Sequence, residues 1–188
     1  PDDGDRRILY GVADHAAGGQ SVLEAVWSAG LALKGGRLGA MQVLRLLEFE
    51  PVRRRFGIAE ADLPLIGSWV RDSGIRWGAD ERARRSLGLP AERQNTWAHG
   101  LDRLLLGYAM PCAEDGPFHG ILPLDAVEGA AAQALSAFLA FTEAVVRAAQ
   151  ELEGARSLSE WGRVFQGLAD GLWQTDEALE AERQRFVE

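Results

Sequence analysis

The sequence predicts a mainly α-helical domain, a helical bundle with one short strand near the N-terminus. Apolar residues make up 47% of the chain, and most of them recur at helical spacing. Ser, Thr and Asp stand where the helices should begin, and Gly stands where several should end. A length of 188 residues is enough to bury a substantial core.

The N-terminal run Arg7-Ile8-Leu9-Tyr10-Gly11-Val12 is short and β-prone, and a polar, glycine-containing stretch follows it. It predicts one strand at the edge of an adjoining domain. We therefore expect residues 1–14 to form that edge and residues 15–188 to form the helical domain. The chain begins without an initiator methionine or an apolar signal segment, which is typical of a piece cut from a longer protein.

Short helices are expected in the first third of the chain, over residues 21–33, 38–47 and 52–56. Gly57 should end the third of these in a left-handed conformation. Asp62 is expected to cap the next helix, because Pro64 is tolerated only in a first helical turn. That helix should end at Gly74 and bury four side chains: Leu63, Ile66, Trp69 and Val70.

A strongly patterned helix is expected to begin at Thr96, which should cap its first turn. Its core-facing stripe should consist of Trp97, Leu101, Leu104, Leu105 and Tyr108. Gly100 and Gly107 lie two turns apart on one side of this helix. A glycine inside a helix costs ~1 kcal/mol relative to alanine, so the pair indicates that another segment, the connector from Ile75 being the nearest in sequence, approaches closely there.

The connector itself is expected to fold back so that Trp77 packs against the helix that begins at Thr96. On this view, replacing Trp77 by alanine would cost ~3–5 kcal/mol through the cavity that it leaves. Arg76 would then be free to pair with Asp80 or Asp102. The rival interpretation makes Trp77 an exposed platform on which bases stack.

The second half of the chain predicts a long central helix over residues 126–152, since two neighbouring faces of it are apolar. An irregular loop over residues 111–123, with Cys112 and His119, precedes it. Ser157 and Glu160 form a capping-box pattern before another amphipathic helix. A last, mostly charged helix is expected over residues 176–186, at the rim of the bundle.

The residue types exclude several kinds of active site. Lys34 is the only lysine, and no G-x-x-x-x-G-K-[ST] motif occurs, which excludes a phosphate-binding loop of that type and a lysine-dependent nuclease site. Cys112 is the only cysteine, and no H-E-x-x-H motif occurs, so no zinc constellation is apparent. We therefore expect no catalytic residue, no metal site and no cofactor, and hence neither ATP hydrolysis nor DNA cleavage by this chain.

The chain also shows no apolar run of the ~18–20 residues that a membrane span needs. A single cysteine suits a reducing compartment, so a cytoplasmic location without membrane contact is expected.

Charge is unevenly distributed along the chain. Residues 45–103 hold 11 basic and 9 acidic groups, whereas residues 104–188 hold 5 and 14. An acidic module repels phosphate, so any DNA contact is expected from the middle third. Seven arginines there are candidate DNA contacts: Arg53, Arg54, Arg55, Arg76, Arg82, Arg84 and Arg85. Such clusters also occur as solvated faces or in ion pairs, and that alternative stays open.

The chain resembles the RecC family most closely in two segments: Ser73-Gly74-Ile75-Arg76-Trp77-Gly78-Ala79-Asp80, and Thr96-Trp97 followed by the run from Gly100 to Met110. A third run, Leu44-Arg45-Leu46-Leu47-Glu48-Phe49-Glu50-Pro51-Val52 with Arg55-Phe56-Gly57-Ile58, resembles the sequence that precedes these motifs in the family. The resemblance spans roughly residues 44–110, and compatible helices lie on either side.

RecC is the gamma subunit of exodeoxyribonuclease V, the RecBCD complex, and has the layout of a superfamily 1 helicase without working ATPase motifs. The resemblance implies that this region corresponds to the helical 2B-type subdomain of such a helicase. It also implies a role in double-strand-break repair and recombination, in which RecC helps to split duplex ends, guides single strands towards RecB and RecD, and recognises Chi. RecB, RecD and DNA are the partners implied.

A second hypothesis makes the chain a purely structural helical module for protein interaction, without DNA contact. The arginines of residues 45–103 distinguish the two, because a set exposed on one face favours DNA, and burial or pairing favours a scaffold.

Overall fold

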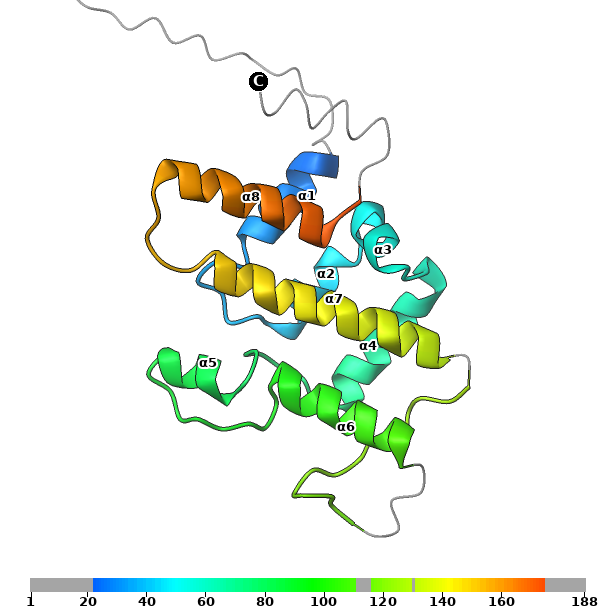
Figure 1. Ribbon diagram of the computed structural model, residues 1–188. Coiled ribbons are helices and arrows are strands. Elements are labelled where there is room, and N and C mark those ends of the chain that lie inside the picture. The colour runs from blue at the N-terminus through cyan, green and yellow to red at the C-terminus, as the bar shows by residue number, and fades with distance from the viewer. Residues whose placement is uncertain (1–21, 111–115, 130, 175–188) are drawn as a thin grey trace, which may run out of the picture.

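A computed structural model describes residues 22–110, 116–129 and 131–174 (Figure 1). These residues form eight α-helices and a 3₁₀ turn, without an extended sheet. The helices are α1 (Val22–Leu31), α2 (Ala40–Leu46), α3 (Glu50–Phe56), α4 (Leu63–Asp72), α5 (Glu81–Ser86), α6 (Trp97–Ala109), α7 (Ala131–Glu151) and α8 (Leu158–Leu172), and the 3₁₀ turn is Glu60–Asp62. The described part is mainly α, as predicted. The strand expected at residues 7–12, Cys112 and the helix expected over 176–186 lie outside the described residues.

Helix α7 is the centre of the bundle, as its two apolar faces predicted. Figure 1 shows it crossing the molecule, with α1 and α8 on one side and α5 and α6 on the other. It contacts α3, α4 and α8, and the Phe138 and Phe141 rings on it have no exposed surface. The helix begins at Ala131 rather than at the expected residue 126, because Gly129 takes a positive φ of 52° that does not continue a helix.

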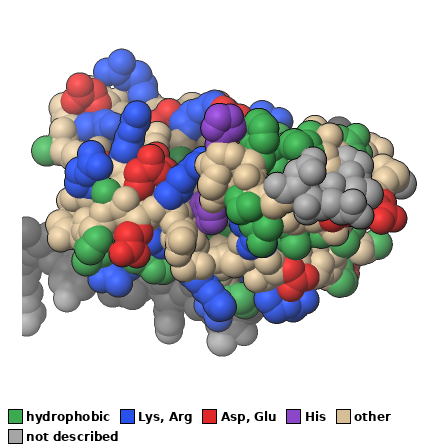
Figure 2. Space-filling view, turned by 90° about the horizontal axis from the view of Figure 1, so that it is seen from below, with side chains coloured by type: hydrophobic (Ala, Val, Ile, Leu, Met, Phe, Trp, Pro, Cys, Tyr) green, Lys and Arg blue, Asp and Glu red, His purple; other side chains and the backbone are tan. Residues whose placement is uncertain are grey.

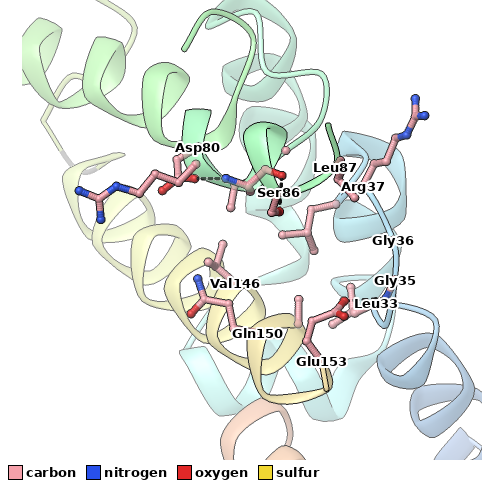
Figure 3. A pocket seen from close by; sticks show the side chains of 16 residues that line it. Leu33, Gly35, Gly36, Arg37, Asp80, Ser86, Leu87, Val146, Gln150 and Glu153 are labelled. Carbon is pink, nitrogen blue, oxygen red and sulfur yellow. Dashed lines mark hydrogen bonds between the residues drawn. The ribbon is translucent and has the colours of Figure 1, made fainter. Parts of the chain in front are cut away.

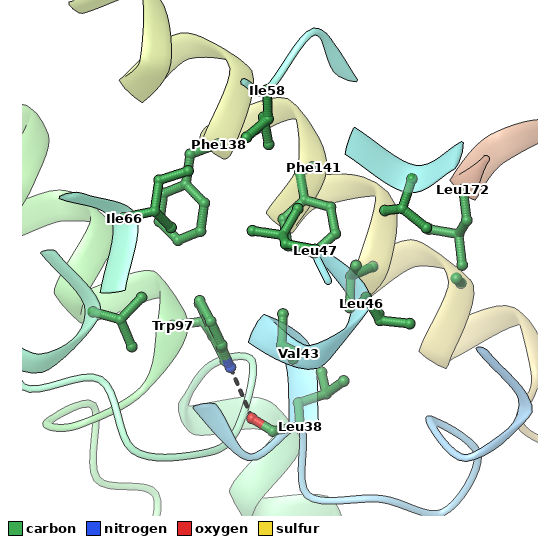
Figure 4. Packing of buried hydrophobic residues seen from close by; sticks show 14 of the residues in the cluster. Leu38, Val43, Leu46, Leu47, Ile58, Ile66, Trp97, Phe138, Phe141 and Leu172 are labelled. Atoms are coloured by element: carbon green, nitrogen blue, oxygen red, sulfur yellow. Dashed lines mark hydrogen bonds between the residues drawn. The ribbon is translucent and has the colours of Figure 1, made fainter. Parts of the chain in front are cut away.

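The core joins this helix to the rest of the chain through large apolar side chains (Figure 4). Trp69 and Trp97 are both about 1% exposed, and each ring lies near that of Phe138. Each indole N–H has a backbone acceptor: Trp69 Nε1 donates to Ala126 O at 3.0 Å and Trp97 Nε1 to Leu38 O at 2.7 Å. Both tryptophans are therefore fixed core residues with satisfied polar groups.

Most of the predicted helix ends are confirmed. The Thr96 hydroxyl accepts from His99 N at 3.2 Å, Ser157 and Glu160 form the capping box of α8, and Gly57 ends α3 with a φ of 68°. Asp62 does not cap α4 with its side chain. Its backbone is already helical and its carboxylate accepts from Ala59 N at 3.3 Å, since a 3₁₀ turn leads directly into α4.

Helix α5 was not predicted, because its six residues are too few to show an apolar period. Asp80 caps it by accepting from Ala83 N at 2.8 Å, and Glu81 stands in its first turn. An acidic cap followed by an acidic first turn is the sequence signal that marks this helix.

The predicted core-facing stripe of α6 is only partly correct. Trp97 and Leu104 are buried, but Leu105 is 39% exposed and Tyr108 is 49% exposed. The buried face is instead the one that holds Gly100 and Gly107. Glycine has no apolar side chain, so the apolar periodicity of the sequence did not count these two positions as buried. The predicted buried face is therefore rotated by about one residue from the observed one.

The close approach predicted at these two glycines is confirmed. A Cβ on Gly100 would overlap the Ile75 side chain, which comes from the expected connector. A Cβ on Gly107 would overlap the Leu124 carbonyl and lie 2.8 Å from Asp125 N. At Gly107 it is therefore the backbone after the 116–123 loop that approaches, not the connector.

Candidate nucleic-acid interface

The backbone of residues 76–78, the Trp77 motif, is hydrogen-bonded to two segments that are distant in the sequence. The N–H groups of Arg76 and Trp77 both donate to Asn95 O, at 3.0 and 3.2 Å, and Trp97 N donates to Gly78 O at 2.9 Å. On the other side, Gly78 N donates to Arg37 O at 2.6 Å. The connector thus folds back on the start of α6, as predicted, and fixes the α5 region on the bundle.

The side chain of Trp77 contacts two guanidinium groups. The Cζ of Arg84 is 4.2 Å from its ring centroid and that of Arg37 is 5.4 Å. The residue is half-buried and is not part of the apolar core cluster. The backbone of Trp77 therefore packs against the start of α6 as predicted. Its ring does not join the apolar core and is held by cation–π contacts instead.

Arg84 is a buried structural residue within a basic helix. It is 6% exposed, its Nη1 donates to Glu92 O at 3.0 Å, and its Nη2 donates to Trp77 O at 3.2 Å. It has no carboxylate partner among the described residues, and its buried Nε has no hydrogen-bond partner there. Two carbonyls and an aromatic face thus replace water around this charge, and they tie α5 to the Trp77 motif.

The triplet at 53–55 is also engaged with its own fold. Arg53, whose side chain is 12% exposed, donates to Leu47 O and Glu48 O at 2.9 and 2.8 Å and pairs with Glu60. Arg54 pairs with Glu50 one turn before it, and Arg55 Nε donates to Asp170 O at 3.3 Å. Contacts to Leu47 and Glu48 satisfy carbonyls at the end of α2.

Five of the seven candidate arginines are exposed, and three of these also lack a partner within the described residues. Arg76, Arg82 and Arg85 have no ion-pair or side-chain hydrogen-bond partner within the described residues. Arg82 and Arg85 are three residues apart in α5 and therefore lie on neighbouring positions of its surface. The pairing of Arg76 with Asp80 or Asp102 is wrong, since Asp80 caps α5 and Asp102 pairs with Arg93.

The face that contains α5 and α6 is rich in basic groups. Figure 2 looks at the molecule from that side and shows Lys and Arg side chains spread over it, with some acidic groups among them, histidines near the middle and an apolar area beside these histidines. Several of the exposed apolar side chains belong to the end of α6 and the following loop: Leu105, Tyr108, Met110, Phe118 and Leu122.

A groove of about 660 Å³ lies next to the Trp77 motif, between α5, α7 and the segment 33–38 (Figure 3). Its floor is apolar, from Val146 and Ala149 of α7, and charged groups stand on its walls, among them Arg37, Arg82 and Glu153. Glu153 is held in place because its Oε1 accepts from Gly35 N at 3.0 Å. The groove lining contains no histidine or cysteine that would act as a base or nucleophile.

A second, more polar cleft of about 520 Å³ lies beside the first turns of α6. Two arginines and two histidines line it: Arg93, His99, Arg103 and His119. The pKa of His99 is lowered, chiefly because burial removes water from the imidazolium, and further because Arg93 and Arg103 repel its charge. Sequence reasoning missed this cleft because its residues come from segments that the 116–123 loop brings back to α6.

Metal ligands do not gather in the part of the chain that the structure describes. Among residues 22–110, 116–129 and 131–174, no three His, Cys, Asp or Glu side chains are grouped as a metal site would need. No helix in the same ranges combines the length and the apolar character that crossing a membrane takes.

Comparison with known proteins places residues 20–188 on the model of the RecBCD enzyme subunit RecC fourth domain. The chain is 39% identical over 171 residues to the RecBCD enzyme subunit RecC of Mycolicibacterium smegmatis, and 36% identical over 178 residues to that of Escherichia coli. The Mycobacterium tuberculosis RecC is 37% identical over 166 residues. These alignments cover 91%, 94% and 88% of the chain but only 16%, 16% and 15% of the relatives.

Proposed function

The chain belongs to the RecC family, and from that premise we propose that it acts as a helical domain of a RecC-type subunit in an ATP-dependent helicase–nuclease complex. Such a complex would repair double-strand breaks in the cytoplasm, with RecB and RecD as the partners of this subunit. Within it, the subunit would help to split duplex ends, guide single strands and recognise Chi. The domain would correspond to a 2B-type helicase subdomain, built on residues 15–188 beside the edge of a core at residues 1–14.

The DNA contact of this domain is proposed for Arg76, Arg82 and Arg85. The observation that supports it is that these three cations are exposed and unpaired within the described residues, whereas Arg53, Arg54, Arg55 and Arg84 have partners inside the fold. Unpaired arginines keep all their donors for phosphate oxygens. Arg76 directly precedes Trp77, and Arg82 and Arg85 lie on α5, which Arg84 ties to the Trp77 carbonyl.

The alternative function is a structural helical module that contacts only protein. The observation in its favour is the engagement of four of the seven arginines with the fold, together with a formal net charge of −8. The apolar surface at the end of α6 would then meet another protein surface.

The experiment that separates these functions uses the complete subunit assembled with RecB and RecD. We expect the triple variant Arg76→Gln, Arg82→Gln, Arg85→Gln to bind duplex ends more weakly and with a smaller salt dependence. The logarithmic slope should fall by about 0.9 for each phosphate that the variant no longer neutralises. The matched control replaces three exposed arginines of other helices, Arg45, Arg147 and Arg163, and removes the same charge. Equal salt slopes for the two triple variants would refute the DNA contact and favour the structural module.

A further inference from the structure

The polar cleft beside α6 has the donor groups of an anion site. Its walls come from the connector before α6, from α6 itself and from the loop after it, and are formed by Arg93, Gln94, His99, Arg103, His119, Gly120, Ile121 and Leu122. Two arginines, two histidines and one glutamine therefore line one volume of about 520 Å³. No Asp or Glu lines it, which sets it apart from the rest of this acidic chain.

Arg103 is held in place by backbone carbonyls rather than by an acid. Its Nε donates to Leu122 O at 3.0 Å, and its Nη1 donates to Ser73 O at 2.8 Å and to Asp72 O at 3.3 Å. No carboxylate within the described residues neutralises it. Its positive charge is therefore fixed in position and remains available to an anion in the cleft.

Arg93 has a partner, but that partner lies outside the lining of the cleft. One of its terminal nitrogens, Nη2, pairs with Asp102, while its Nε and Nη1 have no hydrogen bond in the described structure. A guanidinium group has five N–H donors, so an ion pair through one nitrogen leaves the others for a second acceptor.

His99 adds an imidazole whose surroundings favour one neutral tautomer. Its Nδ1 is buried and has no partner among the described residues. A proton on that nitrogen would have no acceptor, so the neutral imidazole is best protonated at Nε2 and donates from there. The lowered pKa of His99 agrees with this arrangement, because burial disfavours the imidazolium and because Arg93 and Arg103 repel a second proton.

We propose that this cleft binds a phosphate group, held by Arg93, Arg103 and His99. Fixed guanidinium groups and a neutral imidazole donor match the oxygens of a tetrahedral oxyanion, and guanidinium groups bind phosphate in a bidentate manner. The group is either free phosphate or a phosphate of a polynucleotide. The proposal is independent of the DNA contact proposed above, because it uses none of the three exposed arginines assigned there.

The first test titrates inorganic phosphate into the 188-residue chain and follows the imidazole resonances of His99 by NMR. We expect saturable shifts that sodium chloride at equal ionic strength does not reproduce. Arg93→Gln should weaken binding about tenfold, the ratio expected for one charge-assisted hydrogen bond. Asp102→Asn should strengthen binding, because it removes the carboxylate that pairs with Arg93, and a variant that fails to fold cannot give that result.

The matched controls use the exposed ion pair between Arg147 and Glu143 on α7. Arg147→Gln and Glu143→Gln change the net charge in the same way as the two cleft variants, and both should leave phosphate binding unchanged. Shifts that chloride reproduces, or equal effects of the cleft and control variants, would overturn the proposal.

The source of the phosphate group follows from competition. A single-stranded oligodeoxynucleotide without terminal phosphates should displace inorganic phosphate from His99 if the cleft takes a phosphodiester. If it does not compete, while inorganic phosphate still binds with the expected order of the variants, the cleft takes a free or terminal phosphate.

A pH titration with sulfate, which stays a dianion in the mildly acidic range, tests the role of His99. Protonation adds a positive charge beside the anion, so affinity should rise as the pH falls through the His99 pKa, and bound sulfate should raise that pKa. The charged groups around His99 are Arg93, Arg103 and Asp102, and His119 shares the cleft. The His99→Gln variant should lose this pH dependence and His119→Gln should keep most of it. The reverse order would refute the role assigned to His99.

Discussion

Replacing Gly107 by alanine tests how the loop after α6 is attached to the bundle. A Cβ at this position would overlap the Leu124 carbonyl and approach Asp125 N to 2.8 Å, which is closer than real Cβ contacts. Both obstacles are backbone, so no flexible side chain can move away. The change therefore has to displace either α6 or the chain that follows Leu124.

The expected cost follows from what such a displacement breaks. Leu124 N donates to Arg103 O at 2.8 Å, and two residues later Ala126 O accepts from the buried Trp69 indole. Overpacking costs ~1–3 kcal/mol, and a broken hydrogen bond about 1 kcal/mol more. The better helix propensity of alanine returns ~1 kcal/mol. We therefore expect a net destabilisation of about 1–3 kcal/mol.

Gly162 supplies the control within the same protein. It lies inside α8, is exposed, and has no heavy atom within 4 Å of the position of a Cβ. Gly162→Ala should therefore stabilise the chain by up to ~1 kcal/mol. Thermal unfolding followed by circular dichroism should show opposite shifts in Tm, at roughly 2–4 °C for each kcal/mol in a chain of this size. Equal Tm values for the two variants would refute the close backbone approach at α6.

Two further predictions concern the Trp77 motif and the start of α8. Trp77→Ala should lower the free energy of unfolding by less than ~2 kcal/mol, rather than by the ~3–5 kcal/mol of a core tryptophan, because the ring is half-buried and held by cation–π contacts. A larger loss of stability in urea unfolding would show that the ring is a core residue. Ser157→Ala should destabilise α8 by about 1 kcal/mol, the usual cost of removing a helix cap. The same change should raise the pKa of Glu160, because hydrogen bonds from Ser157 keep that pKa below its ordinary value. Because the pKa of Glu160 is lowered in the folded state, its ionised carboxylate stabilises the fold. That contribution is fully present above the ordinary carboxyl pKa and is lost as the pH falls through the pKa of the folded state. NMR titration of the Glu160 carboxyl would reject this account if its pKa were the same in the variant.

The features that the sequence predicted correctly are those decided within a few residues. Thr96 and Ser157 cap their helices, and Gly57 ends α3, because each contact joins neighbours along the chain. The central position of α7 was also predictable, since a helix with two apolar faces must be covered on both. The face that α6 buries was not predictable from apolar periodicity alone. It depends on two glycines that accept the Ile75 side chain and the Leu124 backbone, and the second of these lies 17 positions along the chain.

The state of the basic residues illustrates a different limit. Arg84 and Arg85 are adjacent in the sequence, yet Arg84 is buried and Arg85 is exposed. A charge pattern cannot separate them, because the partners of Arg84 are the carbonyl oxygens of Trp77 and Glu92, and every residue has a carbonyl. Arg103 is held in the same way. Where acids bind the arginines, as Glu50 binds Arg54, the spacing is visible in the sequence. Arginines held by the backbone of this domain can therefore be recognised only once the fold has placed the carbonyls.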